Sequence, residues 1–244
     1  MLQSLTETTR EAVYGMPAAA WYDLEDQADL DQWMARGDTA SARLLSKLRD
    51  DQLGQLGDAD VHSLPAVEPQ VMTRRLQQTD ADRFVALPEW GAQPCETTPL
   101  TRQIAHPLIQ SLLPSYGAGL LTRMVARLLE LASLPARLQQ LLHELMSGRA
   151  AKADAQMEVH GDGESGLGMV EAARGRLIHR VAQADGIIRR YQILAPTEWN
   201  FHPEGVVARG LLGLVADNDH LLKHYAGLFI NAVDPCVGYR LEVV

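Results

Sequence analysis

The chain has 244 residues, 46% of them hydrophobic, so it is long enough to bury a core in one large or two small domains. Its net charge of −9 argues against binding to nucleic acid or anionic membranes, for which basic surfaces are expected. No apolar run approaches the length of a membrane span, and the first residues lack a basic-then-apolar leader, so we expect a cytoplasmic location. In that reducing compartment, the two cysteines are expected to be free thiols or metal ligands.

The first 90 residues carry no visible chemistry. Apolar residues at helical spacing among acidic ones predict helices within 24–34 and 40–56, and two prolines within 63–69 predict a linker. We expect residues 1–90 to form a helical, acidic N-terminal region and residues 91–244 to form a second domain.

The second domain begins with predicted helices. Apolar residues recur at steps of three and four positions over 120–131 and again over 138–145, a pattern typical of helices that pack in a core. Because proline removes a backbone donor, Pro114 and Pro135 are expected to break these helices. Residues from about 99 to 148 should therefore form a helical bundle.

A β-hairpin is predicted over residues 176–194. With the two-residue period of a strand, one face would carry Leu177, His179 and Val181, and the other would carry Arg176, Ile178 and Arg180. Asp185-Gly186 supplies a two-residue turn, in which glycine accepts a positive φ. A second run rich in β-branched residues, Ile187 to Leu194, provides the partner strand.

The segment after the hairpin contains two prolines and two large aromatic residues within positions 195–203. Since proline fixes φ and cannot donate to a strand ladder, the strand should end there in a rigid loop. We expect Trp199 in this loop to be buried.

Three parts of the chain resemble the large subunit of nickel-iron hydrogenases, and they occur in that family's order. The residues that carry the resemblance are Glu96 to Arg102, the two ends of the hairpin (Glu171-Ala172-Ala173-Arg174-Gly175 and Pro196-Thr197-Glu198-Trp199-Asn200), and Asp234-Pro235-Cys236. The resemblance covers roughly residues 95–244. It implies an α+β fold, with a helical bundle packed on a small antiparallel sheet.

The departures from the family's pattern bear on function. Hydrogenase large subunits hold nickel and iron with two Cys-x-x-Cys pairs, whereas here the first pair is absent and Tyr239 stands in place of the last cysteine. Since the number and softness of ligands select a metal, this chain cannot build the same binuclear centre. The chain therefore resembles the truncated maturation proteins of the HupK/HoxV type, which look like scaffolds for iron that carries cyanide and carbon monoxide ligands.

The resemblance also implies roles for individual residues. Cys236 would be the metal-binding thiolate, and Arg174 and Thr197 would donate hydrogen bonds to the cyanide nitrogens. If these groups share a pocket, we expect the Cys236 sulfur to lie about 5 to 9 Å from both donors. Arg174 has an alternative role in a salt bridge that stabilises its turn, with Glu171 as a possible partner. Cys95 is either a second metal ligand or a buried, inert thiol.

We therefore expect a scaffold rather than an enzyme. It would bind iron with cyanide and carbon monoxide ligands transiently, and its partners would be hydrogenase maturation proteins and the precursor of the hydrogenase large subunit. We expect neither nucleic acid nor a membrane as a partner. Two alternatives stay open: a divergent large subunit that binds nickel, and a regulatory or interaction protein that has kept only the fold.

Overall fold

The structure is a computed structural model that describes residues 2–147, 156–160 and 164–243. The chain forms two compact units that are interleaved along the sequence. The first comprises residues 1–59 and 102–152, and the second comprises residues 60–101 and 153–244. The chain crosses between the units after residues 59, 101 and 152, and none of these crossings falls at residue 90, where the sequence predicted a boundary. The reason is that residues 60–101 supply strands and helices to the second unit.

The first unit is built from helices that pack round one long helix, α9. Its elements are α1 (Leu2–Thr9), the π-helical turn η1 (Arg10–Tyr14), α2 (Ala18–Tyr22), α3 (Gln27–Arg36), α4 (Ala40–Asp50), α8 (Pro107–Tyr116) and α9 (Leu120–Met146). Helix α9 contacts α1, α2, α4 and α8. Trp21 is fully buried, with its ring 5.1 Å from that of Tyr14 and 5.4 Å from that of Trp33. The helices predicted within 24–34 and 40–56 are confirmed as α3 and α4.

Two prolines lie inside helices, so the prediction that they break the bundle helices was wrong. Pro114 lies within α8, and Pro135 lies within the 27-residue helix α9. A proline costs one backbone hydrogen bond and crowds the preceding turn. In α9 this cost is offset by apolar side chains that are buried from Leu120 to Ala132, because packing of such a face is what stabilises most protein helices.

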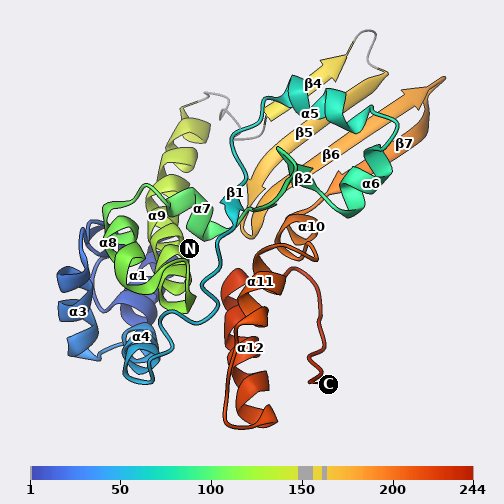
Figure 1. The fold of residues 1–244 in the computed structure, drawn as a ribbon. Coiled ribbons are helices and arrows are strands. Elements are labelled where there is room, and N and C mark those ends of the chain that lie inside the picture. The colour runs from blue at the N-terminus through green and yellow to red at the C-terminus, as the bar shows by residue number, and fades with distance from the viewer. Residues whose placement is uncertain (1, 148–155, 161–163, 244) are drawn as a thin grey trace. The chain divides into compact units, whose positions relative to one another are not determined.

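The second unit contains a four-stranded antiparallel sheet (Figure 1). Its order is β4 (Gln156–His160), β5 (Ser165–Ala172), β6 (Gly175–Ala184) and β7 (Ile187–Leu194). Asp185 and Gly186, with φ of 53° and 72°, make the turn between β6 and β7. The predicted hairpin is therefore confirmed. A smaller sheet pairs β3 (Gln93–Glu96) with β1 (His62–Ser63) in parallel and with β2 (Glu89–Trp90) in antiparallel.

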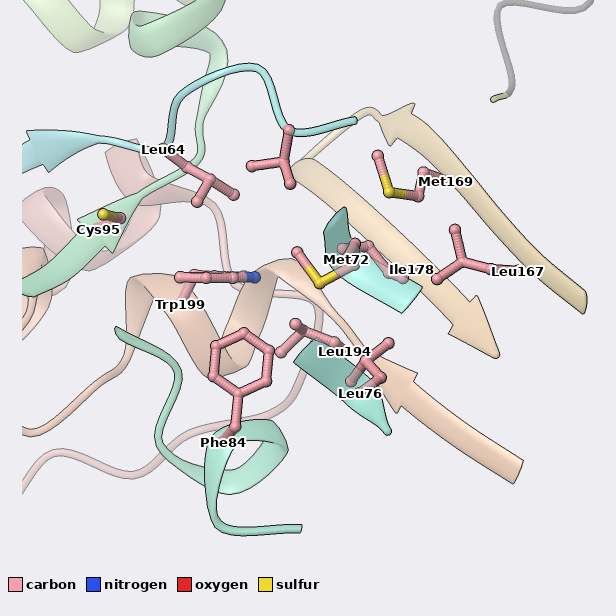
Figure 2. Packing of buried hydrophobic residues seen from close by; sticks show 11 residues of the cluster. Leu64, Met72, Leu76, Phe84, Cys95, Leu167, Met169, Ile178, Leu194 and Trp199 are labelled. Carbon is pink, nitrogen blue, oxygen red and sulfur yellow. The ribbon is translucent and has the colours of Figure 1, made fainter. Parts of the chain in front are cut away.

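Helices cover one face of the four-stranded sheet. Helices α5 (Pro69–Leu76) and α6 (Ala81–Ala86) lie across it, and the short helix α10 (Pro196–Asn200) follows β7 (Figure 1). Met169, Ile178 and Leu194 stand opposite one another on adjacent strands, so they point to the same face. Figure 2 shows these residues with Met72, Leu76, Phe84 and Trp199 in one core cluster.

Trp199 is fully buried, as predicted, and its ring meets that of Phe84 edge to face at 5.9 Å. The helices and the small antiparallel sheet together confirm the expected α+β class.

The remaining helices are α7 (Pro99–Gln103), where the chain crosses from the second unit to the first, and α11 (Val206–Leu212) and α12 (Asp219–Val233) near the C-terminus. Helix α12 ends at Asp234, whose φ of 63° is left-handed. Among the described residues, no helix is both long and apolar enough to cross a membrane.

Candidate metal site

The turn between β5 and β6 is fitted closely against Thr97. Gly175 has a φ of +132°, and a Cβ at this position would lie 2.2 Å from the backbone oxygen of Thr97. The next residue, Arg176, donates its N–H to the Thr97 hydroxyl at 2.9 Å. Only glycine tolerates both the positive φ at position 175 and the lack of room for a Cβ there. The close approach fixes Arg174, the preceding residue, beside the segment that follows Cys95.

Asn200 fastens α10 to the same segment. Its Oδ1 accepts a hydrogen bond from the Thr97 N–H at 2.9 Å, and its Nδ2 donates to the Thr97 carbonyl at 2.9 Å. The same Nδ2 donates to the Arg174 carbonyl at 3.5 Å. Since Asn200 and Thr97 are both buried, these bonds join the β5–β6 turn and the segment after the hairpin into one rigid arrangement.

The tail after α12 brings two more groups to Arg174. Asp234 Oδ2 lies 3.4 Å from Arg174 Nε, and Cys236 Sγ lies 4.0 Å from Arg174 Nη1. The separation from the sulfur is shorter than the expected range of about 5 to 9 Å. Cys236 is exposed, whereas Nε of Arg174 is shielded from solvent and makes no hydrogen bond of good geometry. The guanidinium therefore stands where it can stabilise a negative charge on the sulfur.

The alternative role for Arg174 was a salt bridge with Glu171. In the structure, the ion pair of Glu171 is made by Arg176, whose Nε lies 2.6 Å from the carboxylate. Arg176 Nη1 also donates to the Pro65 carbonyl at 2.6 Å. Arg176 thus stabilises the turn, and Arg174 pairs with Asp234 in the tail.

Thr197 lies in the first turn of α10 and is half-buried. Its carbonyl accepts a hydrogen bond from Phe201 N at 2.9 Å, which continues the helix. Through Asn200, this helix is tied to the turn that carries Arg174. The role predicted for the Thr197 hydroxyl stays a prediction.

Cys95 lies in the hydrophobic core, as Figure 2 shows. Its sulfur is 3.6 Å from the Gln93 carbonyl and 4.0 Å from the Trp90 carbonyl. Burial raises the pKa of the Cys95 thiol and so favours its neutral form. Since metals bind the thiolate, these surroundings favour the inert alternative, and a role as a metal ligand stays a prediction.

Two further features bear on ligand binding. Among the described residues, no group of three or more His, Cys, Asp and Glu side chains could hold a metal ion. A cavity of about 670 Å³ in the second unit is lined by residues that include Phe84, Trp90 and His202. None of the four residues predicted to form the metal site lines it.

Sequence reasoning missed the residues that position the site. Asn200 and Asp234 both lie within segments that carry the family resemblance, yet neither received a role. Their contacts join positions that are far apart in the chain, 103 residues for Asn200 and Thr97. The one available signal was that each stands inside a matched motif.

The fold defines the class of protein. The structure is similar to the [NiFeSe] hydrogenase from Desulfovibrio vulgaris Hildenborough, with a TM-score of 0.52 and 19% sequence identity over 88% of this chain and 61% of that chain. The fold is therefore that of a hydrogenase large subunit. The sequence model described as nickel-dependent hydrogenase matches residues 10–215, and the chain belongs to that family.

Curated relatives refine this assignment. The chain is 30% identical over 230 residues to the hydrogenase expression/formation protein HupK of Azotobacter vinelandii, a match that covers 93% of this chain and 56% of that protein. It is 42% identical over 80 residues to the hydrogenase expression/formation protein HoxV of Cupriavidus necator, covering 31% of this chain and 21% of that protein. The chain is thus of the HupK/HoxV type, and it spans about half the length of its Azotobacter relative.

Proposed function

We propose that the chain acts in hydrogenase maturation, as a scaffold that holds iron with its cyanide and carbon monoxide ligands before the metal reaches the nickel-iron active site. In this role the iron is cargo, and the chain catalyses no reaction. The names of the HupK and HoxV relatives, which describe expression and formation of hydrogenase, support a role in maturation. The observation that carries the proposal is the approach of Arg174 to Cys236 within 4.0 Å.

The chemistry of this pair suits the cargo. A thiolate is a soft ligand for iron, and Cys236 offers it on an exposed tail that a delivering or receiving protein can reach. Arg174 carries donors in a fixed plane, which suit the nitrogen of a bound cyanide. Nη1 lies 4.0 Å from the sulfur and is the donor proposed to reach such a ligand, while Nε pairs with the Asp234 carboxylate.

Asp234 supports the proposal by holding the arginine. Its left-handed backbone turns the tail at the end of α12, and its carboxylate pairs with Arg174 Nε. The Thr197 hydroxyl is proposed to donate to the second cyanide, because Asn200 ties its helix to the turn of Arg174. The role of Asp234 is proposed from its ion pair with Arg174, and the role of Thr197 is proposed from the hydrogen bond between Asn200 and the Arg174 carbonyl.

A single exposed thiolate suits temporary binding better than permanent binding. Stable metal sites are usually closed by several protein ligands, and among the described residues no group of three ligand side chains forms. We therefore assign Cys236 as the anchor. The second thiolate would come from a partner protein, or from Cys95 if the core opens.

The proposed partners are other hydrogenase maturation proteins and the precursor of the large subunit. The proposed location is the cytoplasm, where both cysteines stay reduced.

Metal analysis and infrared spectroscopy of anaerobically purified protein test the proposal. The chain should be produced in cells that make a nickel-iron hydrogenase. We expect iron with cyanide and carbonyl stretching bands, and no nickel. Nickel in amounts equal to iron would indicate a divergent large subunit. Protein free of both metals would support a regulatory or interaction role instead.

A further inference from the structure

Strand β7 forms an open edge of the four-stranded sheet. In the part of the chain that the structure describes, β7 pairs with β6 on one side and is the last strand in the sheet order. It is eight residues long. Natural sheets usually keep edge strands short or cover them, because the free N–H and C=O groups along an edge recruit another strand. The backbone of residues 187–194, called the β7 edge below, is thus available for pairing.

The β7 edge also exposes large apolar side chains. Ile187, Ile188, Tyr191 and Ile193 are 55%, 61%, 57% and 43% exposed. Tyr191 and Ile193 stand opposite Val181 and His179 on β6, and so project from the face that α5 and α6 do not cover. The Tyr191 hydroxyl lies 2.6 Å from His179 Nδ1, which fixes its ring on that face. Several large apolar side chains exposed along one strand favour an interaction site.

Two arginines near the middle of the strand give the edge a positive charge within an acidic chain. Arg190 donates to Asp82 on α6, on the covered side of the sheet. Arg189 lies at a register shift, where Arg190 pairs with Ala182 but Ile188 pairs with Gln183. Among the described residues, Arg189 is exposed and makes no ion pair.

The charges decide between the possible occupants. If a second copy of this chain paired its own β7 in antiparallel along most of the strand, the arginines of the two copies would lie side by side near the centre. Like charges in neighbouring cross-strand positions are destabilising, and at distances within the screening length of about 8 Å salt does not remove the repulsion. A strand with carboxylates at the same positions is attracted instead.

We infer that the β7 edge binds an extended segment of a partner protein, which adds as a fifth strand and carries carboxylates opposite Arg189 among apolar residues. Main-chain hydrogen bonds would supply affinity, and the alternate side chains would supply specificity. An edge that needed only protection from pairing would not combine this length with four exposed apolar side chains. The inference does not depend on metal binding, because none of its residues belongs to the proposed iron site.

Matched synthetic peptides test the inference on the full chain. One short, fluorescently labelled peptide alternates valine and threonine around two central glutamates, and its twin has lysines in their place. Fluorescence anisotropy should show the acidic peptide binding at least about tenfold more tightly than its twin. Methylating the backbone nitrogens on one edge of the acidic peptide should abolish binding, and methylating those on the other edge should not.

Substitutions then locate the binding surface. Arg189→Glu should reverse the preference between the two peptides, whereas Arg36→Glu, the same charge change on an exposed helical residue of the first unit, should leave it unchanged. The inference would be overturned if both peptides bound equally, or if the acidic peptide did not bind. It would also be overturned if binding persisted in both methylated versions of the acidic peptide. So would a dimer in sedimentation velocity that Arg189→Glu abolishes.

Discussion

Arg174 and Cys236 are 62 positions apart in the chain, yet Nη1 of the arginine lies 4.0 Å from the sulfur. Two local features bring them together. Gly175 presses the β5–β6 turn onto Thr97, and the left-handed Asp234 directs the tail back towards the same turn. The predictions below test these features one at a time.

Asn200→Ala should lower the free energy of unfolding by about 2 to 4 kcal/mol, because it leaves the N–H and carbonyl of buried Thr97 without partners. Urea denaturation measures this loss. Asn218 is the matched control, since its side chain caps α12 by accepting a single hydrogen bond from Leu221 N. Asn218→Ala should cost only about 1 kcal/mol. Equal losses in the two variants would show that the hydrogen bonds between Asn200 and Thr97 stabilise the fold no more than an ordinary helix cap does.

Gly175→Ala should destabilise the fold by about 2 to 4 kcal/mol, since the new methyl would collide with the Thr97 backbone. Gly186→Ala provides the comparison. Gly186 also has a positive φ, but no atom lies within 4 Å of a Cβ built there, so only backbone strain of about 1 kcal/mol is expected. Thermal unfolding of both variants measures the difference. A Gly175→Ala variant as stable as Gly186→Ala would contradict the close approach.

Cys95 should make stability depend on alkaline pH. Burial raises the pKa of its thiol, so the folded state holds the proton more tightly than the unfolded state. The stability from this proton is fully present below the unfolded pKa of about 8.5, and it is lost as pH rises through the folded pKa. In a Cys236→Ser background, the free energy of unfolding should therefore fall above that pH more steeply with Cys95 than with Cys95→Ser. Parallel pH profiles would show that the thiol is not buried.

Asp234→Asn should leave the fold almost unchanged but reduce the iron retained by purified protein. The pair with Arg174 is partly exposed and contributes less than about 1 kcal/mol to stability, and asparagine tolerates a left-handed backbone. The arginine, however, loses the carboxylate that holds it beside Cys236. Glu242→Gln is a suitable control, because it removes the Arg240–Glu242 ion pair in the same tail. Iron content that fell equally in both variants would point to general disorder of the tail.

The sequence predicted the elements whose signals are local. Asp185-Gly186 determines its own turn, and the burial of Trp199 was predicted correctly. The loop predicted around Trp199 was wrong, because Pro196–Asn200 form helix α10, in which a proline is tolerated in the first turn. Long-range pairing could not be foreseen. The residues next to Asn200 in the chain do not indicate that its side-chain amide is hydrogen-bonded to Thr97. Likewise, the residues next to Asp234 do not indicate that it pairs with Arg174. Pro135 misled for the same reason, since burial of the α9 face against other helices outweighs the local cost of a proline.

The central claim is that Cys236 anchors the iron, and infrared spectroscopy of anaerobically purified Cys236→Ala tests it most directly. The residue is exposed, so the variant should fold normally by circular dichroism. The account predicts that the cyanide and carbonyl bands disappear in Cys236→Ala and persist in Cys95→Ala. Bands of undiminished intensity in a folded Cys236→Ala protein would contradict it.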